Sequence, residues 1–103
     1  PWAGEVALIM DGQRHVLKHT LGALAELEAG LGDGSLVQLV QRFENGACSS
    51  GDVLALIVAG LRGGGWGGQA RDLLCAEIQG GPMEAARVAA QLLARAFMAP
   101  ENP

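Results

Sequence analysis

Apolar and polar residues alternate near the start of the chain, and the alternation predicts a β-hairpin over about residues 5–18. Two β-compatible runs flank Asp11–Gly12, a pair typical of type I′ turns because both central residues of such a turn need a positive φ. The first strand would place Val6, Leu8 and Met10 on one face. Because a lone hairpin is only marginally stable in water, this face is expected to lie on helices.

After the hairpin the spacing of apolar residues changes from two to three or four, which is typical of helices. Thr20 and Ser35 can each cap a following helix, and Ser49 begins a capping box that Asp52 completes. Gly80 and the two residues after it should break one helix and begin the next. The pattern predicts five short helices, over about residues 21–30, 36–45, 50–62, 69–79 and 82–98.

The predicted helix over residues 50–62 is apolar on nearly every side, which indicates the central and most buried helix. The fold class that follows is α+β, an N-terminal antiparallel β-hairpin packed on a bundle of four to five short helices. A chain of 103 residues is long enough for one domain but not for two, so residues 1–103 are predicted to form a single domain.

The composition narrows the possible partners. Half of the residues are hydrophobic but only 4% are aromatic, so a core of small aliphatic side chains and closely packed helices is expected. The net charge is −4 and Lys18 is the only lysine, which argues against a nucleic-acid partner. No apolar run approaches the roughly 20 residues that span a bilayer, so no membrane partner is expected. No secretory signal is recognised, and the cytoplasm is the expected location.

Residue patterns that would carry chemistry are incomplete. The glycines of residues 63–68 match a dinucleotide-binding pattern in letters, but the segment before them has the features of a helix instead of a strand. We interpret them as a flexible connector. His15 and His19 are four residues apart at the end of a strand, where that spacing does not converge on a metal. Cys48 and Cys75 lack a second pair; a disulfide between them stays open, although free and largely buried thiols are favoured. The sequence predicts no enzyme, cofactor or metal site.

Two apolar stripes run along the last predicted helix. Val88 and Leu92 form one, and Leu93 and Phe97 form the other. Both stripes cannot face one small core, so we expect one of them to be a partner-binding surface, and replacing Val88 and Leu92 by Ser should then spare the fold. Trp66, which lies among glycines, is a further candidate for partner contact. The alternative is that all five residues belong to the core.

The order of these features resembles the small tail assembly chaperone family of gene transfer agents and related phages. The similarity extends from about Gly4 to Phe97 and is most specific over Thr20–Glu28. The residues that carry it are Gly4-Glu5-Val6, Asp11-Gly12, Leu17, Thr20–Glu28, Gly32, Asp52-Val53, Ala59–Gly63, Ala86, Leu92-Leu93 and Phe97.

The resemblance implies a non-catalytic role in building a phage-like tail. Related chaperones are thought to coat the tape measure protein and keep it soluble until the tail tube protein polymerises around it. The resemblance also implies close packing at Gly22, core positions at Leu24 and Leu27, and a charge near a helix end at Glu28. Partners would be the tape measure protein or another tail protein, and a homo-oligomer is possible. The alternatives are a structural tail component retained in the particle and a small enzyme or nucleotide-binding module.

Overall fold

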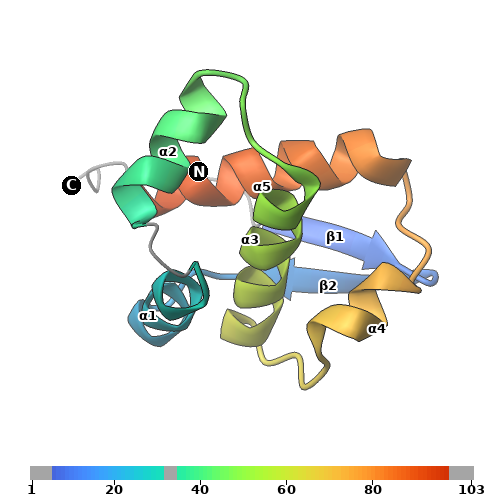
Figure 1. Ribbon diagram of the computed structural model, residues 1–103. Coiled ribbons are helices and arrows are strands. Elements are labelled where there is room, and N and C mark those ends of the chain that lie inside the picture. Colours follow the sequence, from blue (N-terminus) through green and yellow to red (C-terminus); the bar gives the residue numbers. More distant parts are fainter. Residues whose placement is uncertain (1–5, 32–34, 98–103) are drawn as a thin grey trace, which may run out of the picture.

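A computed structural model describes residues 6–31 and 35–97, except for the side chain of residue 97. This part of the chain forms an antiparallel hairpin and five helices. This arrangement confirms the predicted α+β fold (Figure 1). The elements in chain order are β1 (Val6–Met10), β2 (Gln13–Leu17), α1 (Leu21–Gly30), α2 (Leu36–Glu44), α3 (Ser50–Gly63), α4 (Ala70–Leu74) and α5 (Gly81–Phe97).

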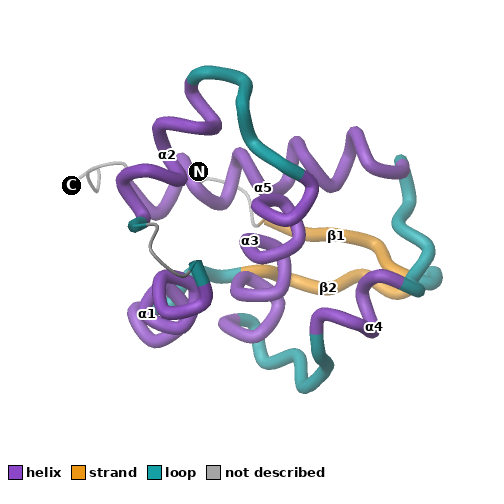
Figure 2. Tube along the Cα trace, viewed as in Figure 1, coloured by secondary structure: helices purple, strands orange, loops and turns teal. Residues whose placement is uncertain are grey.

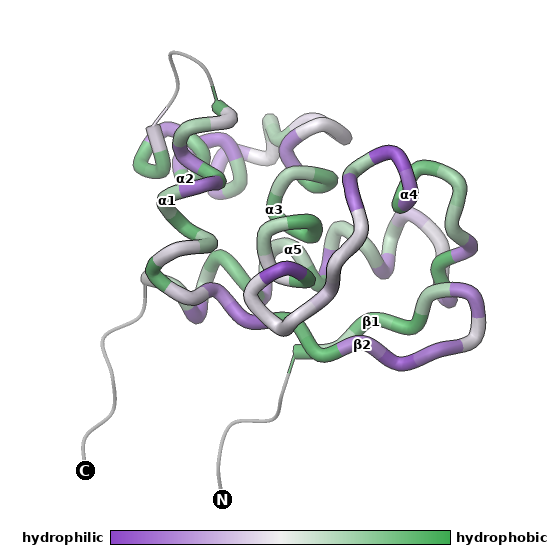
Figure 3. The backbone as a smooth tube through the Cα atoms, turned by 90° about the horizontal axis from the view of Figure 1, so that it is seen from below, coloured by the Kyte–Doolittle hydropathy of each residue, from purple (hydrophilic) through white to green (hydrophobic). Residues whose placement is uncertain are grey.

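The hairpin has the predicted turn and the predicted apolar face. Its register pairs Val6 with Leu17 and Met10 with Gln13. The two turn residues have φ angles of 51° and 81°, the positive values that a type I′ turn requires. Alternation along β1 buries Val6, Leu8 and Met10, each at most 5% exposed. Figure 3 shows the contrast between the largely apolar β1 and the more polar β2.

Helix α3 is the centre of the molecule. It contacts α1 and α4, which lie on opposite sides of it in Figure 1, and it also contacts β2 and α5. Because neighbours cover it from several directions, Leu56, Ile57 and Leu61 are at most 1% exposed. The prediction that this helix is the central one is therefore confirmed.

The helix starts follow from short-range hydrogen bonds. The hydroxyl of Thr20 accepts from the Ala23 amide at 3.1 Å, and the hydroxyl of Ser35 accepts from the Gln38 amide at 3.2 Å. Ser49 opens α3 with the predicted capping box. Each cap satisfies an amide that would otherwise lack a partner in the first turn.

Glycines at the end of α3 allow its backbone to touch β2. The Lys18 amide donates to the Gly60 carbonyl oxygen at 2.9 Å. A Cβ atom at Gly63 would overlap the carbonyl oxygen of Lys18, and one at Gly64 would overlap that of Val16. The interpretation of residues 63–68 as a flexible connector is therefore wrong for its first two glycines, which form a helix–strand contact.

The structural roles implied for α1 hold in part. Leu27 is 5% exposed and Leu24 packs against the core, as expected. Glu28 accepts a hydrogen bond from the Leu36 amide at 3.2 Å and so joins α1 to the start of α2. Gly22 does not serve close packing, because a Cβ atom there would meet nothing within 4 Å.

Helix α4 is shorter than the predicted range 69–79. It ends at Leu74, and the chain then forms a bridge between Ile78 and Met10. The Asp11 amide donates to the Glu77 carbonyl oxygen at 2.8 Å, beside that bridge. Pairing with the free edge of β1 replaces the helical hydrogen bonds that would have continued α4. This competition is tertiary, so the helical spacing of the segment gave no sign of it.

Candidate partner-binding groove

The apolar residues predicted as a partner surface on α5 lie in the core. Val88, Leu92 and Leu93 are 0%, 2% and 5% exposed, so the expectation that one of the two stripes is accessible is wrong for these residues. The physical reason is that α5 packs against both α3 and β1. Two neighbours cover a wider arc of a helix than one does, so Val88, Leu92 and Leu93 all fit beneath them. The side chain of Phe97, which completes the second stripe, lies outside the described residues.

Trp66 is half-buried and packs against the core. Its amide donates to the Leu61 carbonyl oxygen at 2.9 Å, which ties it to the end of α3. Its indole ring covers Gly68, where a Cβ atom would overlap the ring. Trp66 therefore keeps some accessible surface, but it is not among the residues that line the apolar groove between α3, α4 and α5.

An apolar groove of about 530 Å³ lies between α3, α4 and the start of α5. Its walls include Val53 and Leu54 of α3, Leu74 of α4, Ile78 of the bridge, and Ala85 and Ala86 of α5. We call this feature the groove.

The turn from α4 to α5 creates the groove. Figure 2 shows the loop that leaves α4, passes the tip of the hairpin and enters α5 on the same side of α3. Gly80 and Gly81 reverse the chain with φ angles of 89° and 68°, which glycine adopts readily. The bridge at Ile78 fixes the loop on β1, and α4 and α5 each contact α3 with the groove between them.

Two large, exposed apolar side chains belong to or adjoin the groove. Leu74 is 72% exposed and lines the groove, and Met83, the neighbour of the lining residue Pro82, is 83% exposed. Among the described residues, the other exposed large apolar side chains are Leu21 and Val37, which belong to α1 and α2 on the opposite side of α3. Exposed apolar surface next to an apolar hollow is typical of protein contact sites.

Charged residues of both signs are close in sequence to residues that line the groove. Arg71 and Glu77 are exposed, and neither forms an ion pair within residues 6–31 and 35–97. Glu84 pairs with Arg87 at 2.7 Å, and the Arg87 guanidinium holds the pKa of Glu84 below its usual value. The groove walls themselves carry no charged side chain and can bind apolar side chains.

Sequence reasoning overlooked the groove, although one signal was present. Leu73 and Leu74 are adjacent on a short helix, where neighbours point about 100° apart and cannot both face the core. Leu73 is 5% exposed and Leu74 is 72% exposed. The wall formed by Ile78 and Ala86 had no comparable signal, because it depends on how three segments meet.

The groove has little reactive chemistry. The Ser49 hydroxyl accepts a hydrogen bond from the Asp52 amide at 3.1 Å. Cys48 is half-buried in the groove wall, and Cys75 is an exposed free thiol, which corrects the expectation that both are largely buried. In the described ranges, no group of three or more His, Cys, Asp and Glu side chains is arranged to hold a metal ion.

His15 and His19 belong to no group of three or more potential metal ligands within the described residues. His19 is packed against α3 with its Nε2 atom 3.4 Å from the Leu56 carbonyl oxygen, and burial lowers its pKa.

None of the helices in the described part of the chain is both long and apolar enough to cross a membrane.

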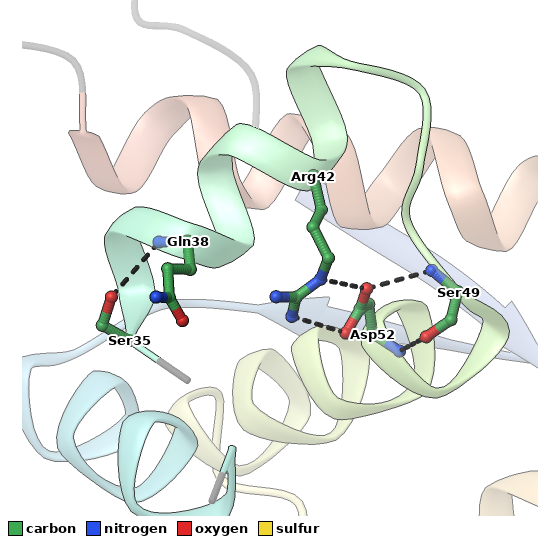
Figure 4. Close-up of polar contacts among 5 residues, drawn as sticks. All are labelled: Ser35, Gln38, Arg42, Ser49 and Asp52. Carbon is green, nitrogen blue, oxygen red and sulfur yellow. Dashed lines mark hydrogen bonds and ion pairs between the residues drawn. The ribbon is translucent and has the colours of Figure 1, made fainter. Parts of the chain in front are cut away.

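An ion pair beside the groove joins α2 to α3. Arg42 donates to both carboxylate oxygens of Asp52 at 2.9 Å, and the Ser49 amide donates to Asp52 Oδ2 at 3.0 Å (Figure 4). The Asp52 side chain is only 11% exposed. The bonds from Arg42, assisted by Ser49, lower the pKa of Asp52 from its usual 3.8.

This lowered pKa predicts an acid-sensitive contribution to stability. The contribution is complete above pH 3.8, the value for Asp in the unfolded chain, and is lost as the pH falls through the lower pKa of the folded state. Asp52→Asn should reduce the free energy of unfolding at pH 7 by about 2 kcal/mol, because hydrogen bonds to a charged group are lost. Denaturant titrations between about pH 5 and pH 2 should show that the free energy of unfolding falls less on acidification in Asp52→Asn than in the parent chain. Equal losses would contradict the assignment.

The sequence model of a protein family described as "Phage tail tube protein, GTA-gp10" matches residues 3–99. The chain belongs to this family. The match covers nearly its whole length and confirms the resemblance to tail proteins of phages and gene transfer agents, without specifying an assembly chaperone. A tail tube family is structural, which is consistent with a protein that is not an enzyme. No curated protein matches this tail-family chain, and no solved structure matches it.

Proposed function

We propose that this member of the tail family is an assembly chaperone that holds an apolar helical segment of the tape measure protein in the groove. Binding would take place in the cytoplasm of the bacterial cell that produces the particles. An amphipathic helix presents apolar side chains at intervals of three and four residues, and a hollow with aliphatic walls receives such anchors. Membership in a tail family supports contact with other tail proteins.

The observation that carries this proposal is the exposed apolar rim of the groove. Leu74 and Met83 are more exposed than the leucines of the core by a wide margin. A client helix would remove both from water and fill the hollow of about 530 Å³. The groove supplies apolar binding surface, as a chaperone of this kind requires.

A charge in the groove wall should weaken client binding. Ala86 is half-buried and lines the groove, so Ala86→Glu would place a carboxylate against the apolar client. We expect capture of the co-expressed tape measure protein to fall at least about tenfold, equivalent to about 1.4 kcal/mol. The measurement is the amount of tape measure protein that co-purifies with the tagged chain.

Ala90→Glu is the matched control. Ala90 is exposed one turn further along α5 and is not part of the groove wall. Both variants should keep the helical circular dichroism and the stability of the parent chain. Equal capture by Ala86→Glu and the parent chain would contradict client binding in the groove.

A second candidate function is a structural component that stays in the finished tail. The description of the matching family as a tail tube protein favours it. A tail component would be present in purified particles in stoichiometric amounts, whereas a chaperone would be absent from them. Quantitative mass spectrometry of purified particles therefore decides between the two roles.

A further inference from the structure

We propose that, before a client binds, a second copy of this chain covers the groove in a two-fold dimer. Leu74 and Met83 of each copy would enter the hollow of the other. The dimer itself follows from the shape and charge of this surface. Only its displacement by a client rests on the proposed function.

The surface around the groove is self-complementary. The hollow and the protruding side chains of Leu74 and Met83 are neighbours on one face, because Leu74 forms part of the wall and Met83 follows the lining residue Pro82. A two-fold axis brings one patch against an identical patch, so that every protrusion can meet a hollow and every hollow a protrusion. Methionine suits such a contact, because its unbranched side chain adapts to irregular space.

Unpaired charges next to groove residues favour the same partner, since Arg71 precedes Leu74 by three residues, about one turn of α4, and Glu77 lies between the lining residues Ala76 and Ile78. Two copies that each carry a net charge of −4 repel at long range, so a close contact needs local attraction. Arg71 and Glu77 are exposed and form no ion pair with any described residue. In the proposed dimer, Arg71 of each copy would lie opposite Glu77 of the other, which would give two attractive pairs.

The proposed assembly is limited to two copies. Because protrusions and hollow belong to the same patch, a two-fold contact leaves no free hollow at which a third copy could add. It also removes Leu74 and Met83 from water while the chain waits for a client. A client helix then competes with the second copy for the same hollow.

Sedimentation velocity over a range of protein concentrations tests the contact. The parent chain should change from monomer to dimer as its concentration rises. Leu74→Gln and Met83→Gln should each raise the dimer dissociation constant at least tenfold. Leu21→Gln is the matched control, because Leu21 is 85% exposed on α1, on the far side of α3, and the dimer should be unchanged. A parent chain that stays monomeric, a series of larger assemblies, or equal weakening by Leu21→Gln would overturn the proposal.

The Cys48 thiol reports on the groove itself. In a Cys75→Ser background, Cys48 in the groove wall is the remaining thiol, and its alkylation by a maleimide should slow as the protein concentration rises. Adding Leu74→Gln should abolish the slowing. An alkylation rate that is independent of concentration in a chain that does dimerise would place the contact elsewhere and overturn the proposal.

The same samples separate this inference from the proposed function. Addition of the tape measure protein should convert dimers into complexes that contain one copy of the chain per bound segment. A complex that retains the dimer contact would overturn sharing of the groove, although client binding would stand. A dimer with the predicted variant pattern that ignores the tape measure protein would leave the dimer in place and refute the proposed function.

Discussion

A Gly63→Ala variant is expected to lose about 3 kcal/mol or more of its free energy of unfolding, the range in which overpacking forces backbone to move. The new Cβ atom would overlap the carbonyl oxygen of Lys18. No rotation of a side chain relieves an overlap with backbone, so the end of α3 would have to move away from β2. That movement would also strain the hydrogen bond from the Lys18 amide to Gly60.

Chemical denaturation of matched glycine variants measures this effect. Gly64→Ala should behave like Gly63→Ala, because its Cβ atom would overlap the carbonyl oxygen of Val16. Gly67→Ala, in the same run of glycines, has open space and no positive φ, and its stability should change by less than about 0.5 kcal/mol. Gly22→Ala in α1 should add about 0.5 kcal/mol, because alanine favours the helix. Equal stability of Gly63→Ala and Gly67→Ala would show that α3 does not rest on β2.

A Leu92→Ser variant is expected to lose about 4 kcal/mol, the sum of a large-to-small substitution in a core and a buried hydroxyl without a partner. Leu92 is 2% exposed and lies against α3, where its Cδ1 atom would be 2.8 Å from a Cβ atom at Gly60. Val88→Ser should cost about 2 kcal/mol for the same reasons with a smaller side chain. Because domains of this size have free energies of unfolding of roughly 5–15 kcal/mol, the double variant should be largely unfolded.

Thermal and denaturant unfolding with Leu74→Ser as control check this prediction. The control makes the same substitution at a side chain that is 72% exposed, and its stability should change by less than about 0.5 kcal/mol. Client capture is then informative only for Leu74→Ser, because loss of binding in a Leu92 variant would follow from unfolding. A stable Leu92→Ser chain would restore the view that this stripe of α5 is a surface.

The local parts of the fold could be predicted because short-range interactions specify them. The turn after Met10 needs two residues that accept positive φ, and Asp followed by Gly supplies them. Ser49 and Asp52 are three residues apart, the spacing at which each side chain reaches the other's amide. The continuous apolar surface of α3 required neighbours on several sides, and these are present.

The candidate site could not be predicted in the same way. The spacing of Val88, Leu92 and Leu93 shows that α5 is apolar on a wide arc, but it does not say whether one neighbour or two will cover that arc. The exposure of Leu74 depends on where α4 ends, and that depends on Ile78 pairing with Met10, 68 residues earlier in the chain.

The sequence by itself therefore determined the hairpin, the helix starts, the central position of α3 and the likeness to tail proteins, since each depends on residues close together or on the overall pattern. Only the tertiary structure decided which apolar residues are buried, which glycines touch backbone, and where the groove lies. Periodicity records how apolar residues are spaced along one helix. Burial depends on which other segments arrive against that helix, and in this chain α5 is covered twice while Leu74 and Met83 are left uncovered.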